Sequence, residues 1–362
     1  MLSRDWQIIR QREIAHIERG LSWVEGQAIT LAFQKTRDAQ DRVTDIEFFL
    51  QAQDGALFLP DTTFMAPLSR PNFVRSISPD GAFALCDFHD YPLVACIEHP
   101  ILFLGSHPNF GHWIADYLGK LLLAELDDDA QARPVIVGLT QGFHAALLER
   151  MGWRSDRLLD LAARPEERGR ILFSDLMVPA ALPYSIAYRY LRDRTGSGDR
   201  TTALPNKERR LYLSRRNLTP RHRVANQDQI ESNLVRIGFE IVEMEAMPLA
   251  TAQTLLSEAR LVVAPVGAAL GNFIFSHTDA ELIHLVPSYL VAPSETEDLF
   301  IFFKRYYYPL LDRLQFVLGD TSDDASPLPF LDRPWVYDWR SLDLAILNAE
   351  KRLIQRQLGR RP

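Results

Sequence analysis

The stretch RRLYLSRRNLTPRHRVANQDQIESNLVRIGFEIVEMEAMPLATAQTLLSEARLVVAPVGAALGNFIF, residues 209–275, decides the fold of this chain. Short apolar runs alternate there with amphipathic segments. They predict strands over 209–215, 239–244 and 261–265, and helices over 224–238, 248–259 and 267–275. Gly238 suits a helix end, and Pro248 suits a helix start. Strands that alternate with helices indicate an open parallel sheet.

The alternation continues on both sides of this stretch. Downstream it predicts strands over 281–287 and 314–320, a helix over 297–307 and a long terminal helix over 341–359. Upstream it predicts strands over 101–105, 134–138 and 171–179, and helices over 110–126 and 142–152. The first hundred residues are instead rich in strand-like runs, at 28–33, 43–51, 56–60 and 82–86. A helix is expected before them, with Trp6, Ile9, Ile14, Ile17 and Leu21 at roughly helical spacing.

This order predicts an α/β protein with two Rossmann-like domains, a strand-rich N-terminal region and a C-terminal helix that crosses back. The N-terminal domain is expected over 1–195, strand-rich over 1–100 and α/β over 100–195. The polar stretch 196–208 reads as a linker, 209–340 as the second α/β domain and 341–362 as the C-terminal helix. A ligand of such a fold binds at the carboxyl ends of the second sheet's strands.

Composition excludes several other classes of protein. The 362 residues include 40 basic and 47 acidic side chains, a net charge of −7, with 47% hydrophobic residues. These values are ordinary for a globular protein and exclude dominant disorder. A mildly acidic chain is a poor binder of nucleic acid, and no apolar run approaches the roughly 20 residues that span a bilayer. The charged N-terminus resembles no signal peptide, so a cytoplasmic protein is expected, with Cys86 and Cys96 as buried, reduced thiols.

The segment 209–223 concentrates positive charge. It holds six arginines and no acidic residue, against fewer than two basic residues expected from the chain average. Arg215 and Arg216 fall where the predicted strand ends, and a guanidinium presents a planar fork that matches phosphate oxygens. We interpret the cluster as an anion site; a solvated basic loop is the alternative.

A second segment, 261–273, runs from a buried strand through Gly267 into a predicted helix. Glycine lets the backbone approach a ligand closely, and the free N–H groups of a helix start favour phosphate. Tight packing alone is the alternative, and the segment is not the GxGxxG fingerprint of dinucleotide-binding proteins. Together with the arginine segment, it indicates a site for a diphosphate group.

The third segment is the predicted helix over 110–126. His112, Asp116 and Lys120 follow one another at helical spacing and so share a face among apolar residues. His112 is a candidate base or anion binder, with Asp116 as its orienting partner. A structural ion pair is the alternative, and a metal site lacks a third ligand at suitable spacing.

Taken in order, these segments resemble glycosyltransferase family 61, the glycosyltransferases of capsular and exopolysaccharide gene clusters. The similar stretches are NFGHWIADYLGKLLLAEL and residues 209–275, and the resemblance covers about residues 100–320. It is most specific over 211–275, in the Ser-Arg-Arg, Arg-x-x-Asn and Gly-Ala-x-Leu-x-Asn elements. The resemblance implies a GT-B-like fold with an acceptor-side N-terminal domain and a second domain that binds a nucleotide-sugar donor. It also implies catalysis without a bound metal or cofactor.

The family's residue roles carry over by position. The resemblance implies catalytic roles for His112 and Asp116 on the acceptor side. It implies donor binding by Arg215, Arg223, Asn226, Gly267 and Asn272, with Leu270 in the same loop. Arg216, Ala268 and His284 are further candidate donor-binding residues. Two positions depart from the family, which has His where this chain has Val266 and Glu where it has His284. A base, His112 in preference to Asp116, would deprotonate an acceptor hydroxyl, and the donor's sugar would transfer with inversion.

Two other functions stay open on the sequence. Val266 and His284 leave room for an inactive nucleotide-sugar-binding or scaffold subunit of a polysaccharide assembly. A nucleotide-dependent oxidoreductase shares the α/β pattern, although the missing GxGxxG argues against it. The expected partners are the donor and a glycan or lipid-linked glycan acceptor, not nucleic acid. The sequence leaves the oligomeric state and a peripheral association with the inner membrane open.

Overall fold

The computed structural model divides the chain into two compact units, Met1–Leu182 and Pro183–Pro362. The described residues are 29–52, 57–58, 74–77, 84–86, 91–105, 109–137, 142–153, 158–177, 179, 184–195, 209–217, 224–276, 279–288, 313–321 and 333–359. The predicted N-terminal helix, the linker over 196–208 and the helix over 297–307 lie outside them. Helix α6 (Tyr184–Arg194) belongs to the second unit, whereas the predicted boundary at residue 195 would assign it to the first.

The second unit contains the α/β sheet that residues 209–275 predict. Its strand order is β13 (Glu240–Val242), β12 (Arg209–Leu213), β14 (Ala259–Pro265), β15 (Glu281–Pro287), β16 (Leu314–Thr321) and β17 (Trp335–Val336). The first five strands pair in parallel, and only β17 is antiparallel to its neighbour. The first parallel strand, β12, thus lies between the second, β13, and the third, β14. This reversal of strand order is the topological switch point at which open α/β sheets bind ligands.

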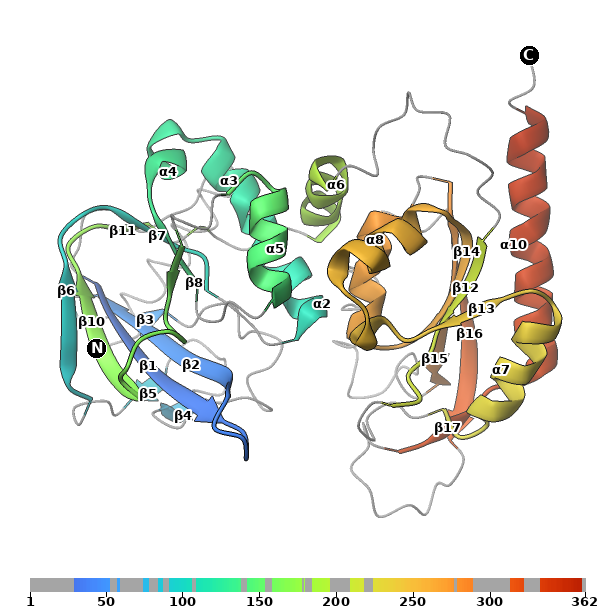
Figure 1. Ribbon diagram of the computed structural model, residues 1–362, viewed down its shortest axis with the longest axis horizontal. Coiled ribbons are helices and arrows are strands. Elements are labelled where there is room, and N and C mark those ends of the chain that lie inside the picture. Colours follow the sequence, from blue (N-terminus) through green and yellow to red (C-terminus); the bar gives the residue numbers. More distant parts are fainter. Residues whose placement is uncertain are drawn as a thin grey trace. The chain divides into compact units, whose positions relative to one another are not determined.

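Helices cover both faces of this sheet (Figure 1). On one face lie α8 (Leu249–Ser257) and the 3₁₀ helix η6 (Ala268–Phe275), and on the other lie α7 (Gln227–Arg236) and α10 (Trp339–Gly359). The short 3₁₀ turn η5 (Met244–Ala246) follows β13. Strands β14 and β15 are buried along nearly their whole length, as expected for parallel strands covered on both faces.

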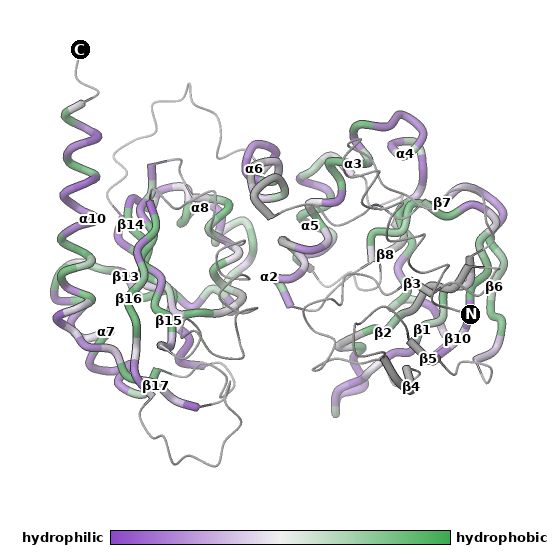
Figure 2. The backbone as a smooth tube through the Cα atoms, turned by 180° about the vertical axis from the view of Figure 1, so that it is seen from behind, coloured by the Kyte–Doolittle hydropathy of each residue, from purple (hydrophilic) through white to green (hydrophobic). Residues whose placement is uncertain are grey.

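The C-terminal helix α10 packs on its own unit. It alternates between hydrophobic and hydrophilic residues (Figure 2) and contacts β14, β15 and β16. Its buried residues are Leu342, Ala345, Ile346, Ala349 and Leu353. Arg352 and Arg356 both pair with the fully buried carboxylate of Glu281 at the start of β15. The helix thus packs on the second sheet, and the expectation that it crosses back stays a prediction.

The first unit combines a mixed sheet with a small parallel one. The mixed sheet has the order β3 (Leu57–Phe58), β2 (Val43–Ala52), β1 (Ile29–Arg37), β10 (Arg168–Phe173) and β6 (Leu93–Ile97). The parallel sheet has the order β11 (Leu176–Met177), β7 (Ile101–Phe103), β8 (Val135–Val137) and β9 (Leu158–Asp160). A separate hairpin pairs β4 (Val74–Ile77) with β5 (Ala84–Cys86). The strand-rich region is thus present, and it takes β10 from the α/β part of the unit. Cys96 on β6 is an exposed thiol, so the prediction that it is buried is wrong.

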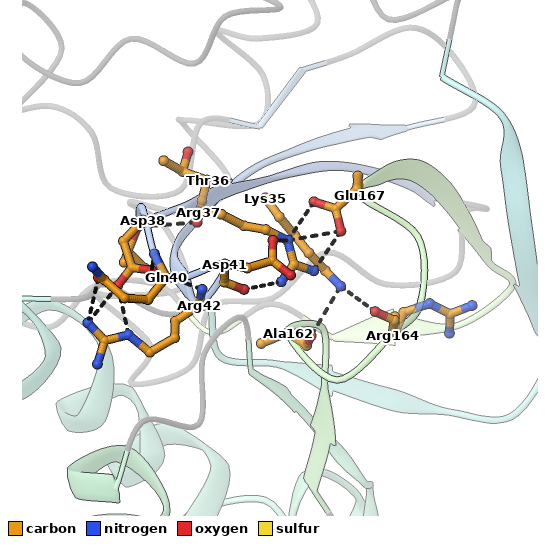
Figure 3. A network of polar contacts seen from close by, with 11 residues as sticks. Lys35, Thr36, Arg37, Asp38, Gln40, Asp41, Arg42, Ala162, Arg164 and Glu167 are labelled. Atoms are coloured by element: carbon orange, nitrogen blue, oxygen red, sulfur yellow. Dashed lines mark hydrogen bonds and ion pairs between the residues drawn. The ribbon is translucent and has the colours of Figure 1, made fainter.

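A polar network joins strand β1 of the mixed sheet to the segment that precedes β10 (Figure 3). The buried Lys35 on β1 donates from Nζ to the carbonyl oxygens of Ala162, at 3.1 Å, and Arg164. Beside it, Arg37 binds the carboxylate of Glu167, with Nη2 2.6 Å from Oε1. The strand therefore holds the segment that precedes β10 through two cationic side chains.

The predicted helix over 110–126 is a helical run of changing pitch. It passes from α2 (Phe110–His112) through a π-helical turn, η2 (Trp113–Tyr117), and a 3₁₀ turn, η3 (Leu118–Lys120), into α3 (Leu121–Glu125). Glycines at 111 and 119, which weaken helix propensity, flank the π turn. Such π turns are rare and frequently occur at functional sites. Helices α4 (Asp128–Ala132) and α5 (Gly142–Arg150) follow.

Candidate functional site

The switch point of the second sheet brings the predicted arginine and glycine together. Arg215 lies two residues after the end of β12, and Gly267 lies two residues after the end of β14, the adjacent strand. Gly267 adopts a φ of 154°, and a Cβ placed on it would lie 2.5 Å from Cζ of Arg215. The guanidinium therefore occupies the space that any side chain at position 267 would need.

Arg215 is largely withdrawn from water. Burial lowers the pKa of its guanidinium, and the negative charge of Glu245 on η5 opposes that shift. Its Nε is buried and has no hydrogen-bond partner among the described residues. A guanidinium held in this way keeps its charge at neutral pH. The Nε–H group lacks the hydrogen-bond acceptor that a buried donor requires, and an anion bound here would supply that acceptor.

Arg216 differs from its neighbour because the protein itself balances its charge. Its Nη1 lies 2.6 Å from the carboxylate of Asp228, and its Nη2 lies 2.6 Å from that of Glu231. These bonds raise the pKa of Arg216. The sequence assigns both arginines to the donor; the structure pairs Arg216 with α7, and its donor role stays a prediction.

The predicted Asn226 lies at the start of α7 and bonds to backbone. Its Nδ2 donates to the carbonyl of Tyr337 at 2.8 Å, and its Oδ1 accepts from the N–H of Tyr337 at 3.2 Å. The nearby chain makes a bridge as well, since Ala225 donates to Trp335. Asn226 thus joins α7 to β17, which accounts for the residue without a donor contact. Arg223 lies outside the described residues.

Of the other predicted donor residues, Ala268 and Asn272 follow Gly267 on η6, and His284 lies within strand β15. Ala268 opens η6, and the buried Asn272 donates from Nδ2 to the carbonyl of Ala269 at 3.1 Å. His284 is fully buried in the middle of β15, with Nδ1 3.0 Å from the carbonyl oxygen of Ala264. His284 therefore belongs to the interior of the sheet, three residues before the end of its strand, and its position argues against direct contact with a ligand.

In the first unit, His112 and Asp116 form the predicted pair. Nδ1 of His112 lies 2.8 Å from Oδ2 of Asp116, and the two side chains are 17% and 15% exposed. Asn109 caps this helix start, accepting from the N–H groups of Gly111 and His112 at 2.9 and 3.3 Å. A carboxylate at Nδ1 fixes the tautomer that leaves Nε2 as the proton acceptor.

The surroundings of the pair are aromatic. The rings of Trp113 and Tyr117 stack at 6.1 Å, and Nζ of Lys120 lies 5.0 Å from the centre of the Tyr117 ring. Lys120 is buried, unlike the half-buried pair. His112 and Asp116 therefore share a face as predicted, whereas Lys120, after the π and 3₁₀ turns, does not share their exposure. The helical run follows β7, the strand at which the order β11-β7-β8-β9 reverses, so it also begins at a switch point.

Sequence reasoning missed the side chains that hold the turn after β12. Glu231, on the inner side of α7, accepts from Ser214 Oγ at 2.7 Å, from Gln227 Nε2 at 2.7 Å and from Arg216 Nη2 at 2.6 Å. The available signal is the spacing of Gln227 and Glu231, an amide and an acid four residues apart beside the buried Ile230. That spacing places them on one face but does not reveal what they face.

The described residues contain neither a metal-binding cluster nor a membrane-spanning helix. No cluster of three or more His, Cys, Asp or Glu side chains within them is arranged to hold a metal ion. Within the same part of the chain, no helix has both the length and the apolarity needed to cross a bilayer.

The fold and site define an α/β protein with a buried arginine at the switch point of an open parallel sheet. The model of the family described as Glycosyltransferase 61 matches residues 110–283, the region in which the sequence resembles that family. The match begins at the His112 helix and ends within β15, so it includes candidate residues of both units. The match supports a glycosyltransferase, as the resemblance in the sequence indicates.

Other comparisons add little. No curated protein matches the sequence. Among solved structures, the chain is similar to the iron-containing dodecameric glycosyltransferase TibC from enterotoxigenic E. coli, with 8% identity and a TM-score of 0.31. That similarity covers 73% of this chain and 74% of the TibC chain. At this TM-score the likeness carries no argument about fold or activity.

Proposed function

We propose that this glycosyltransferase moves a sugar from a nucleotide-sugar donor to a glycan or lipid-linked glycan acceptor in capsular, exo- or lipopolysaccharide biosynthesis. The observation that carries the proposal is the Arg215 guanidinium, buried against Gly267 at the switch point with Nε unpaired. A diphosphate bound there would meet a cationic donor fork and the N–H groups at the start of η6. The family match supports the transferase class, and the polysaccharide setting rests on the family resemblance.

The proposed reaction is a direct displacement with inversion at the anomeric carbon. The acceptor oxygen forms a bond to that carbon while the bond to the diphosphate oxygen breaks, and His112 Nε2 takes the hydroxyl proton. Asp116 holds Nδ1 and stabilises the imidazolium that forms. Arg215 and the start of η6 stabilise the charge that develops on the leaving diphosphate. This charge stabilisation is the role that a metal ion has in other transferases, and we propose catalysis without one.

The proposed architecture is GT-B-like, with an acceptor-side first unit and a donor-binding second unit. It is supported by a parallel sheet in each unit, each with its candidate residues at a switch point. Localisation in the cytoplasm, with or without peripheral association with the inner membrane, is part of the same proposal and follows from cytoplasmic nucleotide sugars as donors.

A second candidate function is an inactive nucleotide-sugar-binding subunit. Val266, which replaces the family's His, favours it, because the buried valine beside Gly267 can neither donate nor accept a proton. This subunit would bind the donor at Arg215 and leave it intact.

The test is a thermal-shift screen of the purified chain against UDP-, GDP-, ADP- and dTDP-sugars and NAD(P)H. A ligand present at about 100 times its Kd adds roughly 2.7 kcal/mol of stability. The stabilising donor is then incubated with and without EDTA and oligosaccharide acceptors, and free nucleotide and product are measured. Transfer that survives EDTA supports the proposal, and binding without turnover supports the inactive subunit. Loss of transfer with EDTA that Mn²⁺ restores contradicts the metal-independent step, and stabilisation by NAD(P)H alone contradicts the transferase.

A further inference from the structure

The turn after β12 is held on both sides of Arg215. Ser214 and Arg216, its neighbours in the chain, both bond to the carboxylate of Glu231 on α7. The hydroxyl of Ser214 also accepts the backbone N–H of Arg216 at 3.2 Å and the Nε2 of Gln227 at 2.8 Å. Arg215 therefore lies in a turn whose two flanking residues are tied to one side chain.

Glu231 has little freedom to respond to solvent. It is 8% exposed, and its Oε1 accepts Ser214 and Gln227 while its Oε2 accepts Nε and Nη2 of Arg216. The backbone of the turn is fixed as well, since Ser214 donates its N–H to the carbonyl of Val242 on β13. A fully bonded buried carboxylate of this kind is rigid and costly to disturb.

These contacts determine which way Arg215 turns. The side chains of Ser214 and Arg216 bond to Glu231 on α7. The guanidinium of Arg215 instead lies against Gly267, which follows the neighbouring strand β14. No hydrogen bond from the described residues holds the Nε of Arg215 itself. Its position therefore depends on the turn, and the turn depends on Glu231.

We infer that Glu231 is a positioning residue that acts through Arg215: it fixes the turn so that the guanidinium is ready for the donor's diphosphate. This inference rests on the proposed function, because it takes the Arg215 site to be the diphosphate site. A purely structural role for Glu231 would leave diphosphate affinity unchanged in any folded variant. Arg216 keeps Asp228 as a partner when Glu231 is neutralised, so a change at Glu231 leaves no unpaired arginine behind.

The test is a double-mutant cycle with inorganic pyrophosphate as the probe, read by phosphorus-31 NMR titration of the full chain. Glu231→Gln keeps the volume of the side chain and is expected to weaken pyrophosphate binding about tenfold, a usual size of coupling between residues linked through a shift of the backbone. In the Arg215→Ala background, the same change is expected to alter affinity less than about twofold. Glu281→Gln is the matched control, since this buried acid also pairs with arginines but lies at the opposite, amino edge of the sheet.

A second readout follows Arg215 directly. Its Nε–Hε cross-peak, assigned from its loss in Arg215→Ala, is expected to exchange slowly with water in the wild type and in Glu281→Gln, and faster in Glu231→Gln. Where Glu231→Gln does not fold, Ser214→Ala replaces it, because it removes the hydroxyl that links Glu231 to the backbone of Arg216.

The outcomes separate the two claims. Equal weakening by Glu231→Gln with and without Arg215, or an unchanged cross-peak, overturns the positioning role. Wild-type pyrophosphate affinity in Arg215→Ala overturns the proposed diphosphate site, and the cross-peak then still reports whether Glu231 fixes Arg215. Weakening by Glu281→Gln equal to that by Glu231→Gln would show a loss of general stability and would also overturn the inference.

Discussion

Two residues from neighbouring strand ends, Arg215 and Gly267, share one space. The absence of a side chain at 267 is what admits the guanidinium, and the guanidinium has no partner there for its Nε among the described residues. Neither residue alone indicates a site: a strand-end arginine is often solvated, and a glycine after a strand often only permits a turn. Their contact makes the case for an anion.

Gly267→Ala tests that contact. The new Cβ would overlap the guanidinium, so Arg215 must move and diphosphate affinity should fall about 10- to 150-fold, the worth of hydrogen bonds to a charged group. Calorimetric titration with pyrophosphate measures it. Gly238→Ala is the control. The φ of 87° at this position would strain the backbone of the alanine variant, as at Gly267, but the added Cβ would meet no atom within 4 Å. Equal affinities in the two variants would refute the contact.

The His112–Asp116 pair makes a separate prediction at the same scale. If His112 is the base, His112→Ala should lower turnover about 10²- to 10⁴-fold while donor affinity changes little. Asp116→Asn should lose less, because it orients the imidazole through the 2.8 Å bond to Nδ1. Steady-state kinetics with a thermal melt of each variant measures both effects. Wild-type kcat in both would remove this pair from the mechanism, and a larger loss in Asp116→Asn would make Asp116 the base.

At the scale of the element, Asn226 connects the start of α7 to β17. Asn226→Ala removes the acceptor and donor that serve the backbone of the buried Tyr337, so unfolding free energy should fall by about 1–3 kcal/mol. Pyrophosphate affinity should stay near the wild-type value, in contrast to the donor-binding role that the family resemblance implies. Chemical denaturation and calorimetry distinguish the two roles: a stable variant with weak binding would restore the donor role.

The elements themselves were largely predictable. Over residues 209–275 the alternation of apolar runs correctly indicates β12, α7, β13, α8, β14 and η6, because strands buried on both faces need continuous apolar residues. The helical run over 110–125 was predicted only as a helix. Its π turn at Trp113–Tyr117 depends on tertiary packing, such as Tyr117 against Gly105, which no periodicity encodes.

Partnerships across the sheet were not predictable. The sequence indicates that Arg215 and Gly267 each follow a strand, but their contact requires β12 and β14 to be neighbours, which is a property of strand order. The pairing of Arg216 with Glu231 and of Asn226 with Tyr337 is hidden for the same reason. Two predicted donor-binding residues thus have partners within the protein.

At the scale of the whole molecule, the two units follow one design. Each has a parallel sheet whose strand order reverses beside its first strand, β7 or β12, and each presents its candidate residues after that strand. Ligands bind open sheets at such reversals because the connections leave in opposite directions and open a crevice. The division of labour between acceptor and donor is therefore proposed for units of related construction.

The stability of the first unit should depend on pH through Lys35. Burial lowers the pKa of this lysine from 10.5, so above its folded pKa the unfolded chain binds more protons than the folded one. The free energy of unfolding should then rise with pH between the folded pKa and 10.5. Below that window, burial of the charged ammonium lowers the free energy of unfolding by its full amount. Denaturant unfolding of wild type and Lys35→Met across this range checks the sign. The difference between the two curves should grow in favour of the wild type as pH rises, and a falling difference would contradict it.

The central claim is that the carboxyl ends of β12 and β14 bind the diphosphate of a sugar donor through Arg215. The most direct measurement is a calorimetric titration of wild type, Arg215→Lys and Arg215→Ala with the nucleoside diphosphate of the donor that stabilises the protein most. We expect Arg215→Ala to bind at least about tenfold more weakly, and Arg215→Lys to be weakened too, because lysine keeps the charge but loses the planar fork. Wild-type affinity in Arg215→Ala would contradict the account.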